Sequence, residues 1–125
     1  MFFVKLQRYT KPLTRLSISF LFLWFGLNQI FDPQNFIGYL PEFILQLNNP
    51  FLFVMGNGIF ETLVAVLLLV GIGVRSVSFV LIIHLLSIII TLGYNDIAVR
   101  DFTLMLITMI VMIGGKDQWC LNFKK

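Results

Sequence analysis

Two ionisable side chains lie inside long apolar stretches of this sequence and are the first candidates for chemistry. Glu61 stands in the segment GNGIFETLVAV, and His84 stands in FVLIIHLLSIII. A carboxylate and an imidazole can each exchange a proton and can hydrogen-bond a ligand. Because such groups are costly to keep among apolar side chains, they mark either a functional site or a polar contact between helices.

The composition predicts that these stretches lie in lipid. The chain has 125 residues, 58% of them hydrophobic and 12% charged, whereas a soluble domain carries about 25% charged residues. The mean hydropathy is +0.93. The basic residues lie between apolar runs rather than on one face, so the net charge of +3 does not indicate binding to nucleic acid. The single cysteine excludes an internal disulfide, and no spacing of ligand residues indicates a metal site.

Four apolar runs are long enough to cross a bilayer as helices, which takes roughly 17–25 residues. They cover residues 13–31, 51–72, 76–93 and 97–113. Asn49-Pro50 before the second run and Gly114-Gly115 after the fourth are typical signals for the start and the end of a helix. The runs do not alternate polar with apolar residues, as strands of a membrane barrel would. The sequence therefore predicts one all-α domain, an integral membrane four-helix bundle.

The connection between the first and second runs contains a further apolar segment, residues 36–47. It is too short to cross a bilayer, and it includes Gly38 and Pro41. We expect a short interfacial or re-entrant segment between helices 1 and 2.

The basic residues predict the orientation, because an excess of Lys and Arg marks the cytoplasmic side. If the N-terminus is cytoplasmic, only Arg100 of the nine basic residues lies outside. Both termini are then cytoplasmic. Arg15, at the start of the first run, is expected to extend its guanidinium to the cytoplasmic interface. The cytoplasmic basic residues are Lys5, Arg8, Lys11, Arg15, Arg75, Lys116, Lys124 and Lys125.

Helix rise places Glu61 and His84 at similar depths. At about 1.5 Å per residue, Glu61 lies about 15 Å below the outer end of its span, and His84 about 12 Å above the inner end of its own. Both positions are close to the bilayer midplane. These depths permit a contact between the two side chains, although they do not fix the rotation of either helix.

Further polar residues belong to the outer half of the predicted bundle. Asn57 is one turn outward from Glu61 on the same helix face, and Gln29 and Thr91 lie near outer helix ends. We therefore predict a polar cleft that opens outward, with Glu61 at its floor. The glycines on either side of Asn57, Gly56 and Gly58, leave room either for close helix packing or for a ligand. The candidate ligand-binding residues are Asn28, Asn57, Glu61, His84, Arg100 and Asp101.

Four segments also carry a resemblance to a known family. They are RLSISFLFLWFGLNQIFDP from Arg15, GNGIFETLVAVLLLVGIGVR from Gly56, IIHLLSIII around His84, and VRDFTLMLI around Arg100. In these segments the chain resembles the DoxX-like family of small four-helix bacterial membrane proteins. The resemblance extends over about the whole chain.

The resemblance implies a place in the lipid bilayer of the bacterial cytoplasmic (inner) membrane. Because some members are similar to the small subunit of a thiosulfate:quinone oxidoreductase, it implies an accessory or quinone-interacting subunit of a membrane oxidoreductase system. Quinone would be the cofactor, and a soluble or membrane oxidoreductase subunit would be the partner. The chain would be a non-catalytic membrane subunit rather than an enzyme, so no catalytic residue is assigned. Glu61, His84 and Arg100 would contact the quinone.

Two other functions remain open. A structural or assembly protein without its own activity would use Glu61 and His84 as contacts between helices. A small proton-coupled transporter or channel would use them as a proton relay. That function needs a homo-oligomer, because four helices enclose only a thin pathway, and the lack of an inverted repeat counts against it.

Overall fold

The computed structural model describes residues 2–40, 42–46, 48–93 and 96–120, and every regular element in these ranges is a helix. This confirms the predicted all-α class. The elements are α1 (Phe2–Leu6), the 3-10 helix η1 (Gln7–Tyr9), α2 (Thr10–Phe31), the 3-10 helix η2 (Pro33–Tyr39), α3 (Glu42–Leu45), α4 (Pro50–Val70), α5 (Val74–Leu92) and α6 (Asp96–Gly114). The four long helices overlap the four apolar runs, and η2 and α3 occupy the short segment between the first two.

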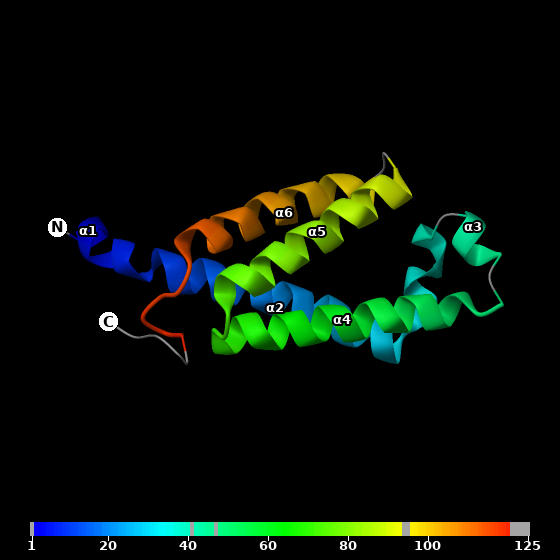
Figure 1. The fold of residues 1–125 in the computed structure, drawn as a ribbon, viewed down its shortest axis with the longest axis horizontal. Helices are drawn as coiled ribbons and strands as arrows, with labels where there is room; N and C mark the ends of the chain where they lie inside the picture. Colours follow the sequence, from blue (N-terminus) through cyan, green and yellow to red (C-terminus); the bar gives the residue numbers. More distant parts are fainter. Residues whose placement is uncertain (1, 41, 47, 94–95, 121–125) are drawn as a thin grey trace.

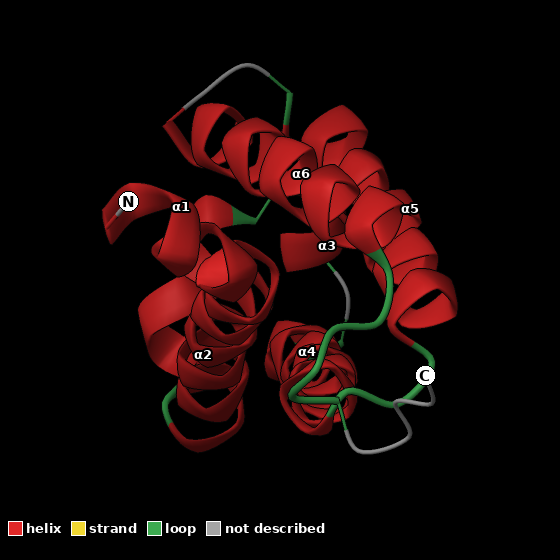
Figure 2. Cartoon of the chain, turned by 90° about the vertical axis from the view of Figure 1, so that its left-hand side faces the viewer, coloured by secondary structure: helices red, strands yellow, loops and turns green. Residues whose placement is uncertain are grey.

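The long helices are arranged as two closely packed pairs (Figures 1 and 2). Helix α2 lies along α4, and α5 lies along α6, while smaller contacts of α2 with α6 and of α4 with α5 join the pairs. Helix α1, the turn between α4 and α5 and the segment after α6 lie at one end of the molecule, here called the terminal end. Helix α3 lies at the opposite end, here called the α3 end (Figure 1).

Proline and glycine set the helix boundaries. Helix α4 begins at Pro50, whose fixed φ and missing N–H suit a first helical turn. It ends at Val70, and the capping residue Gly71 has a left-handed φ of 89° that residues other than glycine rarely adopt. The predicted stop after the fourth run is confirmed, because α6 ends at Gly114 and the Gly115 N–H donates to the Val111 carbonyl. Asn49 precedes α4 but makes no side-chain capping bond.

Two helices of the described chain are long and apolar enough to cross a membrane. They are Pro50–Val70 and Val74–Thr91, each with a mean hydropathy of 2.1. Helices α2 and α6 carry charged residues, among them Arg15, Arg100 and Asp101, and their crossing of the membrane stays a prediction. All four long helices nevertheless expose large apolar side chains, which suits a lipid environment. Examples are Phe20, Leu63, Ile90 and Ile113.

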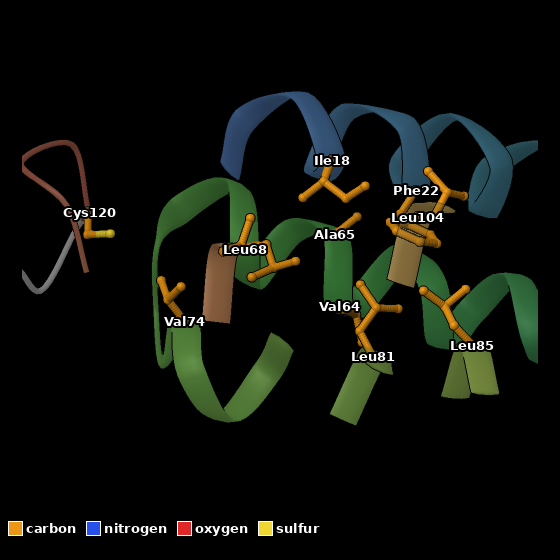
Figure 3. Close-up of a cluster of buried hydrophobic side chains, with 11 residues drawn as sticks. Ile18, Phe22, Val64, Ala65, Leu68, Val74, Leu81, Leu85, Leu104 and Cys120 are labelled. Carbon is orange, nitrogen blue, oxygen red and sulfur yellow. The ribbon is translucent and has the colours of Figure 1, made fainter. Parts of the chain in front are cut away.

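The centre of the molecule is an apolar core to which each long helix contributes. Figure 3 shows Ile18 and Phe22 of α2 above Ala65 and Leu68 of α4. Helices α5 and α6 complete the core with Leu81, Leu85, Leu104 and Val111. In lipid, apolar burial alone does not favour helix association, so this packing stabilises the fold mainly by van der Waals contact.

Helices α2 and α4 approach most closely at a pair of glycines. A Cβ added to Gly26 would lie 2.8 Å from the Thr62 backbone nitrogen and 2.9 Å from the Gly58 carbonyl oxygen. A Cβ added to Gly58 would lie 2.7 Å from both Gln29 Cβ and the Gly26 carbonyl oxygen. Of the two uses weighed for the glycines beside Asn57, Gly58 therefore serves close helix packing. Gly56 has open space around it.

The side chain of Arg15 is enclosed by the protein and does not extend outward, so the predicted extension of its guanidinium was wrong. Its side chain is buried, with Nε 2.8 Å from Asp117 Oδ2 and Nη2 3.3 Å from Oδ1. Nη1 donates to the carbonyls of Leu68 and Leu69. These carbonyls lie in the last turn of α4, where helical carbonyls lack partners within the helix. A guanidinium can satisfy both sets of acceptors at once, so burial between them replaces exposure at the interface.

Asp117 belongs to the segment that follows α6, and Arg15 holds this segment against the terminal end. Burial acts to raise the pKa of Asp117, but hydrogen bonds from Arg15 and from the Trp119 N–H outweigh it. The pKa therefore lies below its ordinary value of 3.8. Nearby, Gly71 meets Cys120 so closely that an added Cβ would lie 2.7 Å from the Cys120 Cα.

We predict that Gly58→Ala destabilises the protein by about 1–3 kcal/mol, because the new methyl group meets the α2 backbone. Gly56→Ala is the matched control, two residues earlier and on nearly the opposite side of the helix. It should leave stability unchanged or raise it slightly, because its methyl group enters open space and alanine favours a helix. Thermal midpoints of the detergent-purified variants measure both effects, and equal midpoints would contradict the close approach.

We predict that Asp117→Asn costs about 3–5 kcal/mol, because it leaves the Arg15 charge buried without its counter-ion. Since folding lowers the pKa of Asp117, its contribution is complete well above pH 3.8 and is lost as the pH falls through the folded-state value. The wild-type thermal midpoint should therefore fall more steeply in acid than that of Asp117→Asn. Asp32 is exposed, so Asp32→Asn is the control variant. If Asp32→Asn lost as much stability as Asp117→Asn, the loss could not be assigned to the Arg15–Asp117 pair.

Candidate ligand-binding site

Glu61 is buried and accepts hydrogen bonds from two amide side chains on two helices. Asn57 Nδ2 donates to Glu61 Oε1 at 3.2 Å, and Gln29 Nε2 donates to Oε2 at 3.3 Å. Asn57 Nδ2 also donates to Gln29 Oε1 at 2.7 Å. The contact of Gly58 with α2 brings Gln29 beside this face of α4. Each oxygen of Glu61 thus accepts one N–H, as an ionised carboxylate can.

His84 of α5 faces Glu61 without a hydrogen bond to it. Nε2 lies 3.7 Å from Glu61 Oε1, which is too long for a hydrogen bond. This nitrogen is buried and has no hydrogen-bond partner among the described residues. The imidazole packs against Phe60 with ring centroids 4.4 Å apart. The two side chains that the depth estimate placed together are therefore close, with a gap between their polar atoms.

Arg100 and Asp101, neighbours on α6, form the third polar element. Nε and Nη2 of Arg100 lie 3.1 Å and 2.9 Å from Asp101 Oδ1. The guanidinium also lies over the ring of Phe25, 4.6 Å from its centroid, in a cation–π contact. Asp101 is buried and Arg100 is partly exposed. This pairing leaves Nη1 of Arg100 directed to neither Asp101 oxygen.

These polar groups line one cavity of about 750 Å³ at the α3 end. Its volume is within the range of about 300–1,000 Å³ that is typical of small-molecule sites. The long helices contribute aromatic walls, including Trp24, Phe25 and Phe60, and η2 and α3 contribute Phe36 and Ile44. The cavity therefore combines aromatic and aliphatic walls with a small set of polar groups.

Comparison with protein families agrees with the resemblance seen in the sequence. The sequence pattern of the DoxX family matches residues 11–93, more than half of the chain. The chain belongs to the DoxX family. It is therefore a membrane protein, in agreement with its two apolar spans. No curated protein and no solved structure matches this DoxX chain.

The matched part of the DoxX chain includes Asn57, Glu61 and His84, which all line the cavity. Arg100 and Asp101 lie beyond the matched residues but line the same cavity from α6. Asn28 is not one of the lining residues; its amide donates to the Trp24 carbonyl of its own helix. The next residue, Gln29, lies on the buried side of α2, because successive helical residues point about 100° apart.

Several lining residues of the DoxX chain were not candidates in the sequence. Phe25 lies one turn before Gln29 and therefore on the same face of α2, a spacing that could have identified it. Phe60 precedes Glu61, and its role depends on the rotation of α4. Within the described ranges, His, Cys, Asp and Glu side chains form no group of three that could hold a metal ion. The carboxylate, imidazole and guanidinium groups of the cavity can hydrogen-bond a ligand, and the first two can exchange protons with it.

Proposed function

We propose that this DoxX protein is an accessory, quinone-interacting subunit of a membrane oxidoreductase system and is not itself an enzyme. The observation that carries the proposal is the cavity at the α3 end, which is lined by aromatic side chains and by a small set of polar groups. A quinone carries two electrons and two protons between its oxidised and reduced forms. Its flat ring and apolar tail need the same combination of apolar walls and a few hydrogen-bonding groups.

Different side chains of the cavity would contact different parts of the quinone. Phe25 and Phe60 offer ring faces and edges for stacking against a flat headgroup. Arg100 is anchored by Asp101 and by Phe25, so its remaining Nη1 can donate to an oxygen of the ligand. His84 Nε2, which lacks a partner among the described residues, supplies a second polar atom. Electron transfer is assigned to a soluble or membrane oxidoreductase subunit that joins this chain.

A purely structural or assembly role is the second candidate, and the bonding of Glu61 favours it. Gln29 and Asn57 join α2 and α4 through Glu61, as polar contacts between membrane helices do. A transporter has weaker support, because Arg15 and Asp117 are packed into the terminal end opposite the cavity.

We also propose that α2, α4, α5 and α6 all cross the bacterial cytoplasmic membrane, with both termini in the cytoplasm. The four long helices coincide with the four apolar runs. The terminal end carries Lys5, Arg8 and Arg75, and a cytoplasmic excess of basic residues orients membrane proteins. In this orientation the cavity at the α3 end lies in the outer half of the membrane.

Fusion proteins test the orientation. Green fluorescent protein joined after Lys125 should fluoresce, because it folds in the cytoplasm, and alkaline phosphatase at the same point should be inactive. The matched control joins both reporters after Gly93, which leaves three spans, and the two signals should reverse. An active phosphatase after Lys125 would contradict a cytoplasmic C-terminus.

We predict that gentle detergent extraction co-purifies about one quinone per chain, measured by organic extraction and mass spectrometry. Arg100→Ala and His84→Ala should each lower the quinone content at least about tenfold, because each removes a hydrogen-bonding group worth roughly 1.5 kcal/mol or more. Arg8→Ala is the control, since Arg8 is exposed at the terminal end.

The yield and elution volume of each variant show whether it is folded. A folded wild-type protein without quinone, but with a stable protein partner in native mass spectrometry, would favour the assembly role. Proton or solute flux through proteoliposomes that depends on Glu61 would favour the transporter.

A further inference from the structure

The gap between Glu61 and His84 has the dimensions of a site for one bridging oxygen atom. Glu61 Oε1 and His84 Nε2 are 3.7 Å apart, and Nε2 makes no hydrogen bond to a described residue. Hydrogen bonds span about 2.7–3.0 Å, so one oxygen placed to the side of this pair can reach both atoms. Both atoms belong to residues that line the cavity, from α4 and α5.

The two sides of the gap have opposite hydrogen-bonding needs. Glu61 receives amide N–H groups from Gln29 and Asn57, so its remaining lone pairs can only accept. An imidazole with its proton on Nε2 can only donate from that atom. With the proton on Nε2, the bridging atom must therefore donate to Glu61 and accept from His84, and a hydroxyl group does both.

A carbonyl oxygen meets only half of this requirement. It can accept from His84, but it has no proton for Glu61, and its lone pairs face those of the carboxylate. The other charged groups of the cavity do not change this preference. Asp101 is paired with Arg100, and Nη1 of Arg100, which bonds no described residue, can donate equally to a carbonyl or to a hydroxyl oxygen at the far side of a ring.

We propose that the cavity binds the reduced, dihydroxy form of its quinone more tightly than the oxidised form, with one hydroxyl bridging Glu61 Oε1 and His84 Nε2. This inference rests on the proposed quinone-binding function and adds which redox form the site holds. A site built to bond a hydroxyl discriminates against the analogue that lacks it, because a buried polar group is then left without a partner.

Short-chain probes test the preference directly. Decylubiquinol and decylubiquinone are titrated anaerobically into the detergent-purified protein, and the fluorescence of Trp24 in the cavity wall reports binding. A Trp119→Phe background makes Trp24 the single tryptophan of the chain. We expect the quinol to bind at least about tenfold more tightly than the quinone. The ratio of the two dissociation constants is measured with Glu61 unchanged. The test therefore does not depend on whether a variant of the site folds.

Glu61→Gln then tests the assigned atom. Its amide can donate to a carbonyl, so the ratio of the two affinities should fall to within about threefold of one. Glu42→Gln is the matched control, because Glu42 is exposed on α3 and is not a lining residue; it should keep the wild-type ratio.

The outcomes separate this inference from the proposed function. Equal affinities for the two forms, tighter binding of the quinone, or an unchanged ratio in folded Glu61→Gln would overturn the inference and leave quinone binding intact. Binding of neither probe to the folded wild-type protein would overturn both.

Discussion

A charged side chain within a bundle of apolar helices must find its partners inside the protein, because lipid offers none. This constraint governs both ends of the molecule. At the terminal end, Arg15 is satisfied by Asp117 and by two carbonyls of α4. At the α3 end, Glu61 is satisfied by two amides, and Arg100 by its neighbour Asp101. The bonds of Arg15 join α2 to α4 and to the segment after α6, and the bond from Gln29 to Glu61 also joins α2 to α4. A charged group without a partner would be costly among apolar side chains.

The close approach of α2 and α4 connects this constraint to the cavity. Gly26 and Gly58 let the two backbones come together where any larger side chain would separate them. Gln29 lies beside Gly58, so the same approach brings its amide within hydrogen-bonding distance of Glu61. The carboxylate is thereby fixed by groups from two helices and faces His84 on a third. The packing of α2 against α4 and the geometry of the site therefore depend on each other, because the glycines that allow the close packing also position Gln29 beside Glu61.

The sequence predicted those features that depend on composition and on local spacing. Apolar runs located the long helices, Gly114-Gly115 marked a helix end, and helix rise placed Glu61 and His84 at one depth. It could not predict rotation about the helix axes, which decides that Gln29 rather than Asn28 faces the cavity. It also could not predict that Arg15 pairs with Asp117, 102 residues further along the chain. A contact between residues so far apart in sequence depends on how the segment after α6 folds back. No local sequence pattern predicts that path.

The cavity itself follows from the arrangement of the helices in pairs. Each pair is tightly packed, and at the terminal end Arg15 and the segment after α6 draw the pairs together. At the α3 end, the pairs face each other through Glu61 and His84, whose polar atoms do not touch. The segment of η2 and α3 is too short to cross a membrane, and it lines the resulting space with Asn35, Phe36 and Ile44. The lining combines polar groups, such as Glu61 and His84 where the pairs face each other, with a larger apolar and aromatic surface. That combination makes the space suited to a ligand with a polar headgroup and an apolar body.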